Sequence, residues 1–171
     1  HEKGKVYVTP HVETDRDAVA IVTITDPEGT SFQVPANEKT EIKTPKLWWP
    51  NGLGEQPLYT VKAELVENDR ICDSKTQRIG LRTMKLIREK DVYGESFCHE
   101  VNGVRFFAMG ADYVPQDNVL ARITKEKCRW LLTQCKACNF NAIRIWGGGY
   151  YPEDSFFDTC DELGLIVFQD M

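Results

Sequence analysis

Carboxylates, an arginine and an aromatic ring stand at the ends of three apolar segments in the second half of the sequence. Asp112 and Asp117 follow the first segment, Arg144 and Trp146 end the second, and Asp170 follows the third. Carboxylate and guanidinium groups form strong hydrogen bonds with hydroxyls, and an aromatic face can stack on the apolar face of a pyranose ring. This set of side chains is suited to binding a sugar.

Three glycines (residues 147–149) directly follow Trp146. Glycine lets a backbone turn sharply with no Cβ in the way, and such a turn would leave Trp146 at the mouth of a pocket. A dinucleotide site is not favoured, because Pro152 occupies the position of the last glycine in the G-x-G-x-x-G pattern.

Each of these residues also has a structural interpretation. Trp146 could be a core aromatic that caps a sheet, and Arg144 could belong to a structural ion pair. Asp112, Asp117 and Asp170 could cap helices or turns, where aspartate is common. The sequence alone leaves both interpretations open.

Alternating strands and helices are predicted to position these side chains. Residues 104–109, 142–146 and 165–168 are apolar and predict three strands, while 124–138 and 152–164 have helical spacing. Strands of this kind joined by helices form a parallel sheet that is covered on its faces. Ligands of such sheets bind beyond the carboxyl ends of the strands, which is where the side chains above are expected.

The first half has a different pattern. Apolar residues alternate with polar ones at 6–8, 18–24 and 59–65, and turn-forming residues separate these runs. Several short strands with such turns predict an antiparallel sandwich, although the region between Asp17 and Lys43 looks short for one. The polar stretch from Arg88 to Val101 predicts a hairpin between the two halves.

Composition limits the classes of partner. The chain of 171 residues has a formal net charge of −5, which argues against nucleic acid as the main partner, and it has no apolar run near the ~20 residues that cross a bilayer. Its six cysteines resemble neither a disulfide framework nor a zinc site; Cys128, Cys135 and Cys138 are predicted to pack a helix face. Neither a metal nor a cofactor is expected, and the compartment stays open between periplasmic, lysosomal and cytoplasmic.

Three stretches together resemble the β-mannosidase branch of glycoside hydrolase family two. They are KLWWPNGLGEQPLYTV (46–61), VNGVRFFAMGADYVPQDN (101–118) and NAIRIWGGGYYPEDSFFDTCDELGLIVFQDM (141–171). The resemblance implies a multidomain β then α/β fold, with an immunoglobulin-like β-sandwich at residues 1–87. Residues 88–171 would form the first three strands of a TIM barrel, since a whole barrel takes roughly 250 residues.

The resemblance also implies an activity, which is the hydrolysis of terminal β-linked mannose from oligosaccharides by a retaining, exo-acting enzyme. Such enzymes use two glutamates on later barrel strands, so no catalytic residue is assigned before Met171 and the isolated chain is expected to be inactive. By the same resemblance, Trp146 borders the −1 subsite and Arg144 lies beneath it. Asp112 and Asp117 are expected as further substrate-binding residues because they follow the first strand. The family's usual Asn-Trp is Asp112-Tyr113 here.

Other functions remain compatible with the sequence. The sandwich could be a non-catalytic carbohydrate-binding or structural module, although the tryptophans of LWWPNG are expected to pack rather than to touch sugar. A β-glucosidase-like or glucosaminidase-like specificity is also compatible. The open edge of an incomplete barrel is expected to cause self-association, and neither nucleic acid nor a membrane is expected as a partner.

Overall fold

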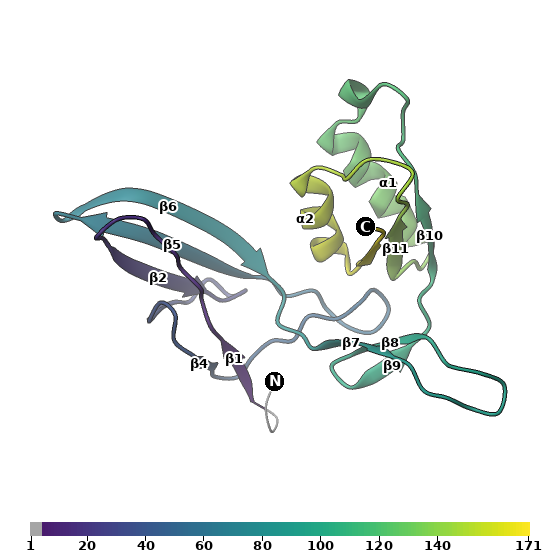
Figure 1. Cartoon of the computed structure of the whole chain (residues 1–171), viewed down its shortest axis with the longest axis horizontal. Helices are drawn as coiled ribbons and strands as arrows, with labels where there is room; N and C mark the ends of the chain where they lie inside the picture. Colours follow the sequence, from purple (N-terminus) through teal and green to yellow (C-terminus); the bar gives the residue numbers. More distant parts are fainter. Residues whose placement is uncertain (1–4) are drawn as a thin grey trace. The chain divides into compact units, whose positions relative to one another are not determined.

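The computed structural model describes residues 5–171, which form two compact units (Figure 1). One unit contains the residues up to Lys46 together with Pro57–Leu81. The other contains Leu47–Gln56 together with Arg82–Met171. The predicted division into domains at 1–87 and 88–171 stays a prediction. The compact units differ from it because residues 47–56 belong to the second unit and because the second unit resumes at Arg82.

The first unit is entirely antiparallel β. Its strands are β1 (Val6–Val8), β2 (Val19–Thr25), β3 (Ser31–Val34), β4 (Thr40–Ile42), β5 (Tyr59–Glu67) and β6 (Arg70–Ile79). Four of them form a sheet in the order β3-β2-β5-β6, and β1 pairs with β4. Val22 and Ile24 of β2 are buried while Thr23 between them is not, so the alternation predicted from the sequence is confirmed.

The turn between β2 and β3 shows why the chain reverses where the sequence predicts. The Asp26 carboxylate accepts hydrogen bonds from the backbone N–H of Glu28 and Thr30, at 2.9 and 2.8 Å. Gly29 adopts a φ of +89°, which glycine tolerates without strain. The region between Asp17 and Lys43, which looks short in the sequence, supplies β2, β3 and β4.

The second unit contains two sheets and two helices. The antiparallel sheet consists of β7 (Met84–Ile87), β8 (Cys98–Val101) and β9 (Val104–Phe106). The parallel sheet consists of β10 (Gly110–Tyr113), β11 (Ala142–Ile145) and β12 (Ile166–Gln169) in that order. The connections run through the turn η1 (Leu120–Arg122) and α1 (Lys125–Ala137), and then through α2 (Asp154–Leu163). The predicted hairpin over 88–101 is confirmed, and it begins in β7.

The first parallel strand was predicted at 104–109, and this prediction is wrong. Asn102 and Gly103 both have positive φ, at 51° and 83°, and this turn folds β9 back onto β8. The parallel strand begins only at Gly110, where an added Cβ would lie 1.9 Å from the carbonyl oxygen of Ala142. Asp112 therefore lies within a strand and not after it.

The helix boundaries agree with the predicted ranges 124–138 and 152–164 to within two residues. Thr124 caps α1, because its hydroxyl accepts a hydrogen bond from the backbone N–H of Lys127 at 3.4 Å. Asn139, just after α1, has a φ of 64°, and Gly164 ends α2 in the left-handed region at 79°. These caps fix where each chain crossover returns to the sheet.

The helices cover one face of the parallel sheet. Ile143 and Ile145 of β11 point to this face and belong to a buried cluster with residues of both helices. The other buried members are Cys128, Leu132, Phe156, Cys160 and Leu165. The predicted packing role of the cysteines is confirmed for Cys128; Cys135 packs against the cluster from a partly buried position, whereas Cys138 is exposed.

The segment 47–56 packs against the ends of the two helices. Trp48 is 1% exposed, and its indole N–H donates to the carbonyl of Asp161 in α2 at 2.7 Å. The Asn51 amide donates to the carbonyls of Lys136 and Phe140, at 3.1 and 2.9 Å, and so satisfies carbonyls at the end of α1. Residues 50–53 form a turn, in which the backbone N–H of Leu53 donates to the carbonyl of Pro50 at 3.0 Å, and residues 47–49 form no strand.

None of the helices described in residues 5–171 is long and apolar enough to cross a membrane.

Candidate functional site

Two of the predicted polar residues, Asp112 and Arg144, lie on the face of the parallel sheet that the helices leave uncovered. Asp112, Arg144 and Phe168 are Cα partners across β10, β11 and β12, so their side chains point to the same face. Ile143 and Ile145, which alternate with Arg144, point to the opposite face under α1 and α2. The sheet register thus brings a carboxylate and a guanidinium side by side.

Arg144 binds two carboxylates. Its Nε and Nη2 donate to the two oxygens of Asp170 at 3.0 and 2.7 Å, which is a bidentate pair. Its Nη1 donates to both oxygens of Asp112 at 3.1 Å. The structural interpretation of Arg144 as an ion-pair residue therefore describes its contacts, and two carboxylates facing one guanidinium leave the cluster with an excess of negative charge.

The same contacts shift two pKa values. The carboxylates of Asp170 and then Asp112 raise the pKa of Arg144. Arg144, followed by the backbone N–H of Gly147, lowers the pKa of Asp170. Because the side chains of Arg144 and Asp112 are 42% and 51% exposed, solvent screens this network. The contribution of this network to stability is therefore small.

Trp146 lies where β11 ends. Its backbone N–H donates to the carbonyl of Tyr113 at 3.1 Å, and its own carbonyl accepts from Gly149 at 3.1 Å. The backbone N–H of Gly147 donates to the Asp170 carboxylate at 3.1 Å. The side chain of Trp146 is 44% exposed, whereas the core aromatic Phe156 is 1% exposed. Trp146 is accordingly a rim residue and not a core residue.

The three glycines act through space rather than through backbone freedom. None of the residues 147–149 has a positive φ, and the expectation that this turn has no room for a Cβ is confirmed by the close neighbours of each glycine. A Cβ on Gly148 would lie 2.0 Å from the ring of Trp146, and a Cβ on Gly149 would lie 2.8 Å from Pro115. The indole ring lies directly on Gly148, which holds it over the turn.

Two further residues complete this face, and the sequence did not single them out. Phe97 and His99, from the hairpin strand β8 and the residue before it, border the same hollow of about 220 Å³ as Asp112, Arg144 and Phe168. The rings of Phe97 and Phe168 meet edge to face, with centroids 6.3 Å apart. Burial lowers the pKa of His99, which favours its neutral form.

Asp117 is not part of this arrangement. Its carboxylate accepts a hydrogen bond from the backbone N–H of Val119 at 2.8 Å and lies 4.0 Å from a guanidinium nitrogen of Arg122. These contacts are those of a turn cap. The residues that the structure brings together are therefore Asp112, Arg144 and Asp170, with the Trp146 corner attached through Gly147.

Comparisons with known proteins show which proteins this chain is related to. The sequence model of the family described as Glycosyl hydrolases family 2 matches residues 2–82. The β-mannosidase B of Aspergillus oryzae is 42% identical over 135 residues, which is 79% of this chain and 16% of that protein. The β-mannosidase B of Aspergillus niger is 38% identical over 147 residues, 86% of this chain and 17% of that protein.

The fold also matches solved structures. The β-D-mannosidase of Dictyoglomus thermophilum superposes with a TM-score of 0.80 at 37% identity, over 88% of this chain and 20% of that one. A β-glucuronidase of Parabacteroides merdae matches with a TM-score of 0.70 at 24% identity, over 96% of this chain and 21% of that one, which shows a shared fold alone. The chain thus spans about a fifth or less of the proteins it matches. With the β-mannosidases as its relatives, the chain belongs to glycosyl hydrolases family 2.

Proposed function

We propose that this chain is part of a retaining, exo-acting glycoside hydrolase that removes terminal β-linked mannose from oligosaccharides. The observation that carries the proposal is the 42% identity, over 79% of the chain, to a protein named β-mannosidase B. The exposed indole of Trp146 beside the carboxylates of Asp112 and Asp170 supports it, because this combination suits a hydroxyl-rich ring with one apolar face.

The proposal includes the architecture. We infer that the first unit is the immunoglobulin-like sandwich of such an enzyme, and that β10, β11 and β12 are the first strands of its TIM barrel. Two observations support the second part. Each connection between these parallel strands contains a helix on the same face, and the opposite face carries Asp112, Arg144 and Phe168 without a helical cover. In a barrel that face would be the interior, and active sites lie at the carboxyl ends of the strands.

The residues of this corner then have separable roles. Trp146 would stack on the sugar that is cleaved, and Asp112 would accept hydrogen bonds from its hydroxyls. Arg144 and Asp170 would position these two groups, since Arg144 binds Asp112 and Asp170 binds Gly147. We assign neither the acid/base nor the nucleophile of a retaining mechanism to a residue of this chain, and the chain alone is expected to be inactive.

The alternative of a carbohydrate-binding module in the first unit has less support. Such a module needs an exposed aromatic platform. In the described part of the first unit, the large apolar residues that are exposed are Val19 and Ile71, and neither is aromatic. The exposed tryptophans and tyrosines lie in the second unit, at Tyr93, Trp130, Trp146, Tyr150 and Tyr151.

A panel of aryl glycosides tests the proposal. The whole protein that contains this chain should hydrolyse 4-nitrophenyl β-D-mannoside with a kcat/KM at least about 10-fold above that for the β-glucoside, β-glucosaminide and β-glucuronide. A clear preference for another sugar would correct the substrate, and a lack of hydrolysis of all four would refute the glycosidase. The isolated chain should show no turnover above a control prepared from the same host, and turnover by the highly purified chain would contradict that expectation.

A further inference from the structure

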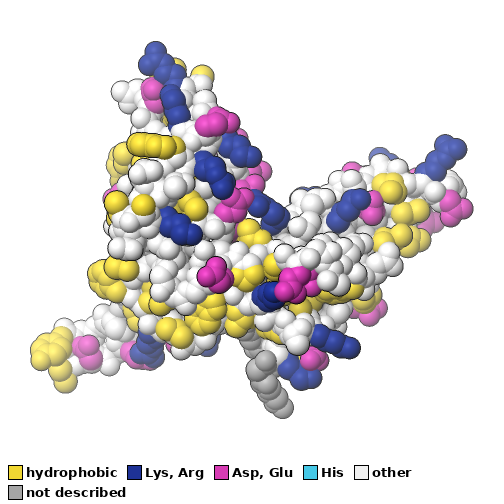
Figure 2. All heavy atoms as spheres, turned by 180° about the vertical axis from the view of Figure 1, so that it is seen from behind, with side chains coloured by type: hydrophobic (Ala, Val, Ile, Leu, Met, Phe, Trp, Pro, Cys, Tyr) yellow, Lys and Arg dark blue, Asp and Glu magenta, His cyan; other side chains and the backbone are white. Residues whose placement is uncertain are grey.

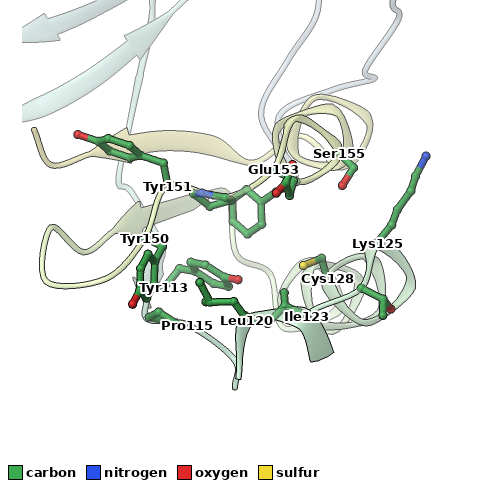
Figure 3. A pocket seen from close by; sticks show the side chains of 13 residues that line it. Tyr113, Pro115, Leu120, Ile123, Lys125, Cys128, Tyr150, Tyr151, Glu153 and Ser155 are labelled. Carbon is green, nitrogen blue, oxygen red and sulfur yellow. The ribbon is translucent and has the colours of Figure 1, made fainter. Parts of the chain in front are cut away.

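A cavity of about 120 Å³ opens beside the N-terminal ends of α1 and α2 (Figure 3). It lies within the second unit, and most of its wall is apolar. The apolar and aromatic part of the wall comes from β10, the β10–α1 connection, the two helices and the loop after Trp146: Tyr113, Pro115, Leu120, Ile123, Cys128, Tyr150, Tyr151, Pro152 and Phe156. Thr124, Lys125, Glu153 and Ser155 complete the wall.

The size of this cavity fits one aromatic ring. An engineered cavity of about 150 Å³ lined by apolar side chains in another protein binds benzene. A space of about 120 Å³ that is partly open to solvent can take a single ring of that kind. A fused two-ring compound exceeds it.

The inner end of the cavity has a polar group. The hydroxyl of Tyr113 points into the space next to the thiol of Cys128 (Figure 3). Burial raises the pKa of Tyr113 to about 12, so this hydroxyl stays protonated at neutral pH and can donate as well as accept. Phe156, which is 1% exposed, closes the floor with its ring centroid 4.7 Å from that of Tyr113.

The mouth of the cavity carries no net charge. Lys125 and Glu153 both border it, and their opposite charges leave no net preference for an anion or a cation. Tyr150 and Tyr151 are 63% and 65% exposed, so their rings can adjust around an entering molecule. A neutral compound suits such an entrance.

We propose that this cavity is a binding site for a neutral, single-ring aromatic compound that bears one hydroxyl, of which a phenol is the simplest example. The ring fills the apolar space between Leu120, Ile123 and Phe156, and its hydroxyl bonds to that of Tyr113. The inference does not rest on the proposed glycosidase function, because it is tested by the binding of a phenol to this cavity and not by enzyme activity.

Binding of 4-fluorophenol to the full chain, followed by fluorine NMR, tests the site. We expect saturable binding with a Kd on the order of 1 mM or tighter. The hydroxyl-free 4-fluorotoluene should bind about 5-fold more weakly, since it leaves the Tyr113 hydroxyl without a partner. The two-ring 6-fluoro-2-naphthol should not compete. Absence of saturable binding to the folded chain, or a naphthol that binds as tightly as the phenol, would overturn the proposal.

Two neighbouring residues provide a matched pair of variants. Leu120 lines the cavity and Val119 does not, and they are similarly exposed at 43% and 48%. Leu120→Trp should fill the space and weaken binding at least about 10-fold, while Val119→Trp should leave the Kd unchanged. An equal effect of both variants would contradict the assignment.

A third variant keeps the test decisive if Leu120→Trp alters the fold. Tyr113→Phe removes only the hydroxyl, so 4-fluorophenol and 4-fluorotoluene should then bind with the same Kd. A phenol preference that survives Tyr113→Phe would place the ligand elsewhere. Far-UV circular dichroism of each variant confirms that it has the wild-type fold.

Discussion

Asp170 connects three parts of the candidate site. Its two carboxylate oxygens bind the guanidinium of Arg144, and one of them also accepts a hydrogen bond from the backbone N–H of Gly147. The backbone N–H of Asp170 donates to the backbone carbonyl of Ile145 at 3.1 Å. Asp170, just after β12, therefore joins the side chain of Arg144 in β11 to the turn that follows Trp146. Replacing this carboxylate should loosen all three contacts.

Asp170→Asn should change how stability depends on pH. Because Arg144 and Gly147 lower the pKa of Asp170 in the folded state, the stability that its carboxylate contributes is present above the unfolded pKa of about 3.9 and is lost as the pH falls through the folded value. Urea denaturation should thus show the largest difference between wild type and variant above about pH 5 and a shrinking difference below about pH 4. A difference that is constant from pH 3 to 7 would contradict the assigned contacts.

Gly148 determines where the indole of Trp146 lies. A Cβ at this position would be 2.0 Å from the ring, so Gly148→Ala must displace it. In the whole protein we expect Gly148→Ala to lower kcat/KM by about 10-fold or more through loss of ring placement.

A double-mutant cycle provides the control for this prediction. In a Trp146→Ala background, Gly148→Ala should have little further effect on kcat/KM, because the ring it displaces is absent. Fully additive effects of the two substitutions would show that Gly148 acts on something other than Trp146.

At the scale of elements, the caps of the two helices decide where β11 and β12 begin. Thr124 caps α1 through Lys127, and its replacement by alanine should destabilise the chain by about 1 kcal/mol in urea denaturation. Thr133 is a matched control: it is exposed in the same helix and its hydroxyl donates to the carbonyl of Arg129. Thr133→Ala should be neutral or stabilising, since alanine has the higher helix propensity. Equal losses for both variants would reject the cap.

Local signals predicted most of these elements. Thr124, Asn139 and Gly164 mark the helix ends in the sequence as in the structure, because caps depend on neighbouring residues only. The first parallel strand was misplaced because 104–109 is apolar enough for either sheet. Asn102-Gly103 is a strong hairpin signal, and it indicates that the apolar residues from 104 onward begin as the second strand of a hairpin, which is β9.

The site was predicted in part for a related reason. Asp112, Arg144 and Trp146 were found from residue type and position along the chain, whereas the Arg144–Asp170 pair depends on the register between β11 and β12. Phe97 and His99 reach the site through the packing of the β7–β8 hairpin, for which the sequence has no local signal. Asp117 was included for its residue type, but its contacts are local to a turn.

At the scale of the whole molecule, apolar surface is unevenly distributed. Figure 2 shows apolar side chains over the unit with the parallel sheet and at the tip of its β7–β8 hairpin, where Val92 and Tyr93 are 90% and 97% exposed. The uncovered face adds Phe97 and Phe168, and β10 and β12 are the edge strands of the sheet. Unpaired edges beside apolar surface favour association between chains.

Light scattering of the isolated chain should therefore detect dimers or larger species. Phe168→Glu, on the uncovered face of an edge strand, should shift the population toward monomer, and Tyr93→Glu at the hairpin tip should shift it less. We also expect the first unit to be the better ordered half in hydrogen exchange. A monomer at high concentration with slow exchange throughout 104–171 would contradict both expectations.

The central claim is that the corner at Trp146 serves the sugar and not the fold. The most direct measurement determines kcat/KM for an aryl β-mannoside and the melting temperature on the same Trp146→Ala variant of the whole protein, with Trp130→Ala, an exposed tryptophan of α1, as the control. We predict a fall in kcat/KM of about 10²-fold with only a slight fall in Tm, because the indole lies on the turn at Gly148 and is not part of the buried cluster under α1 and α2. Trp130→Ala should change neither. A loss of about 3–5 kcal/mol in stability, with normal kinetics in the protein that remains folded, would contradict the account.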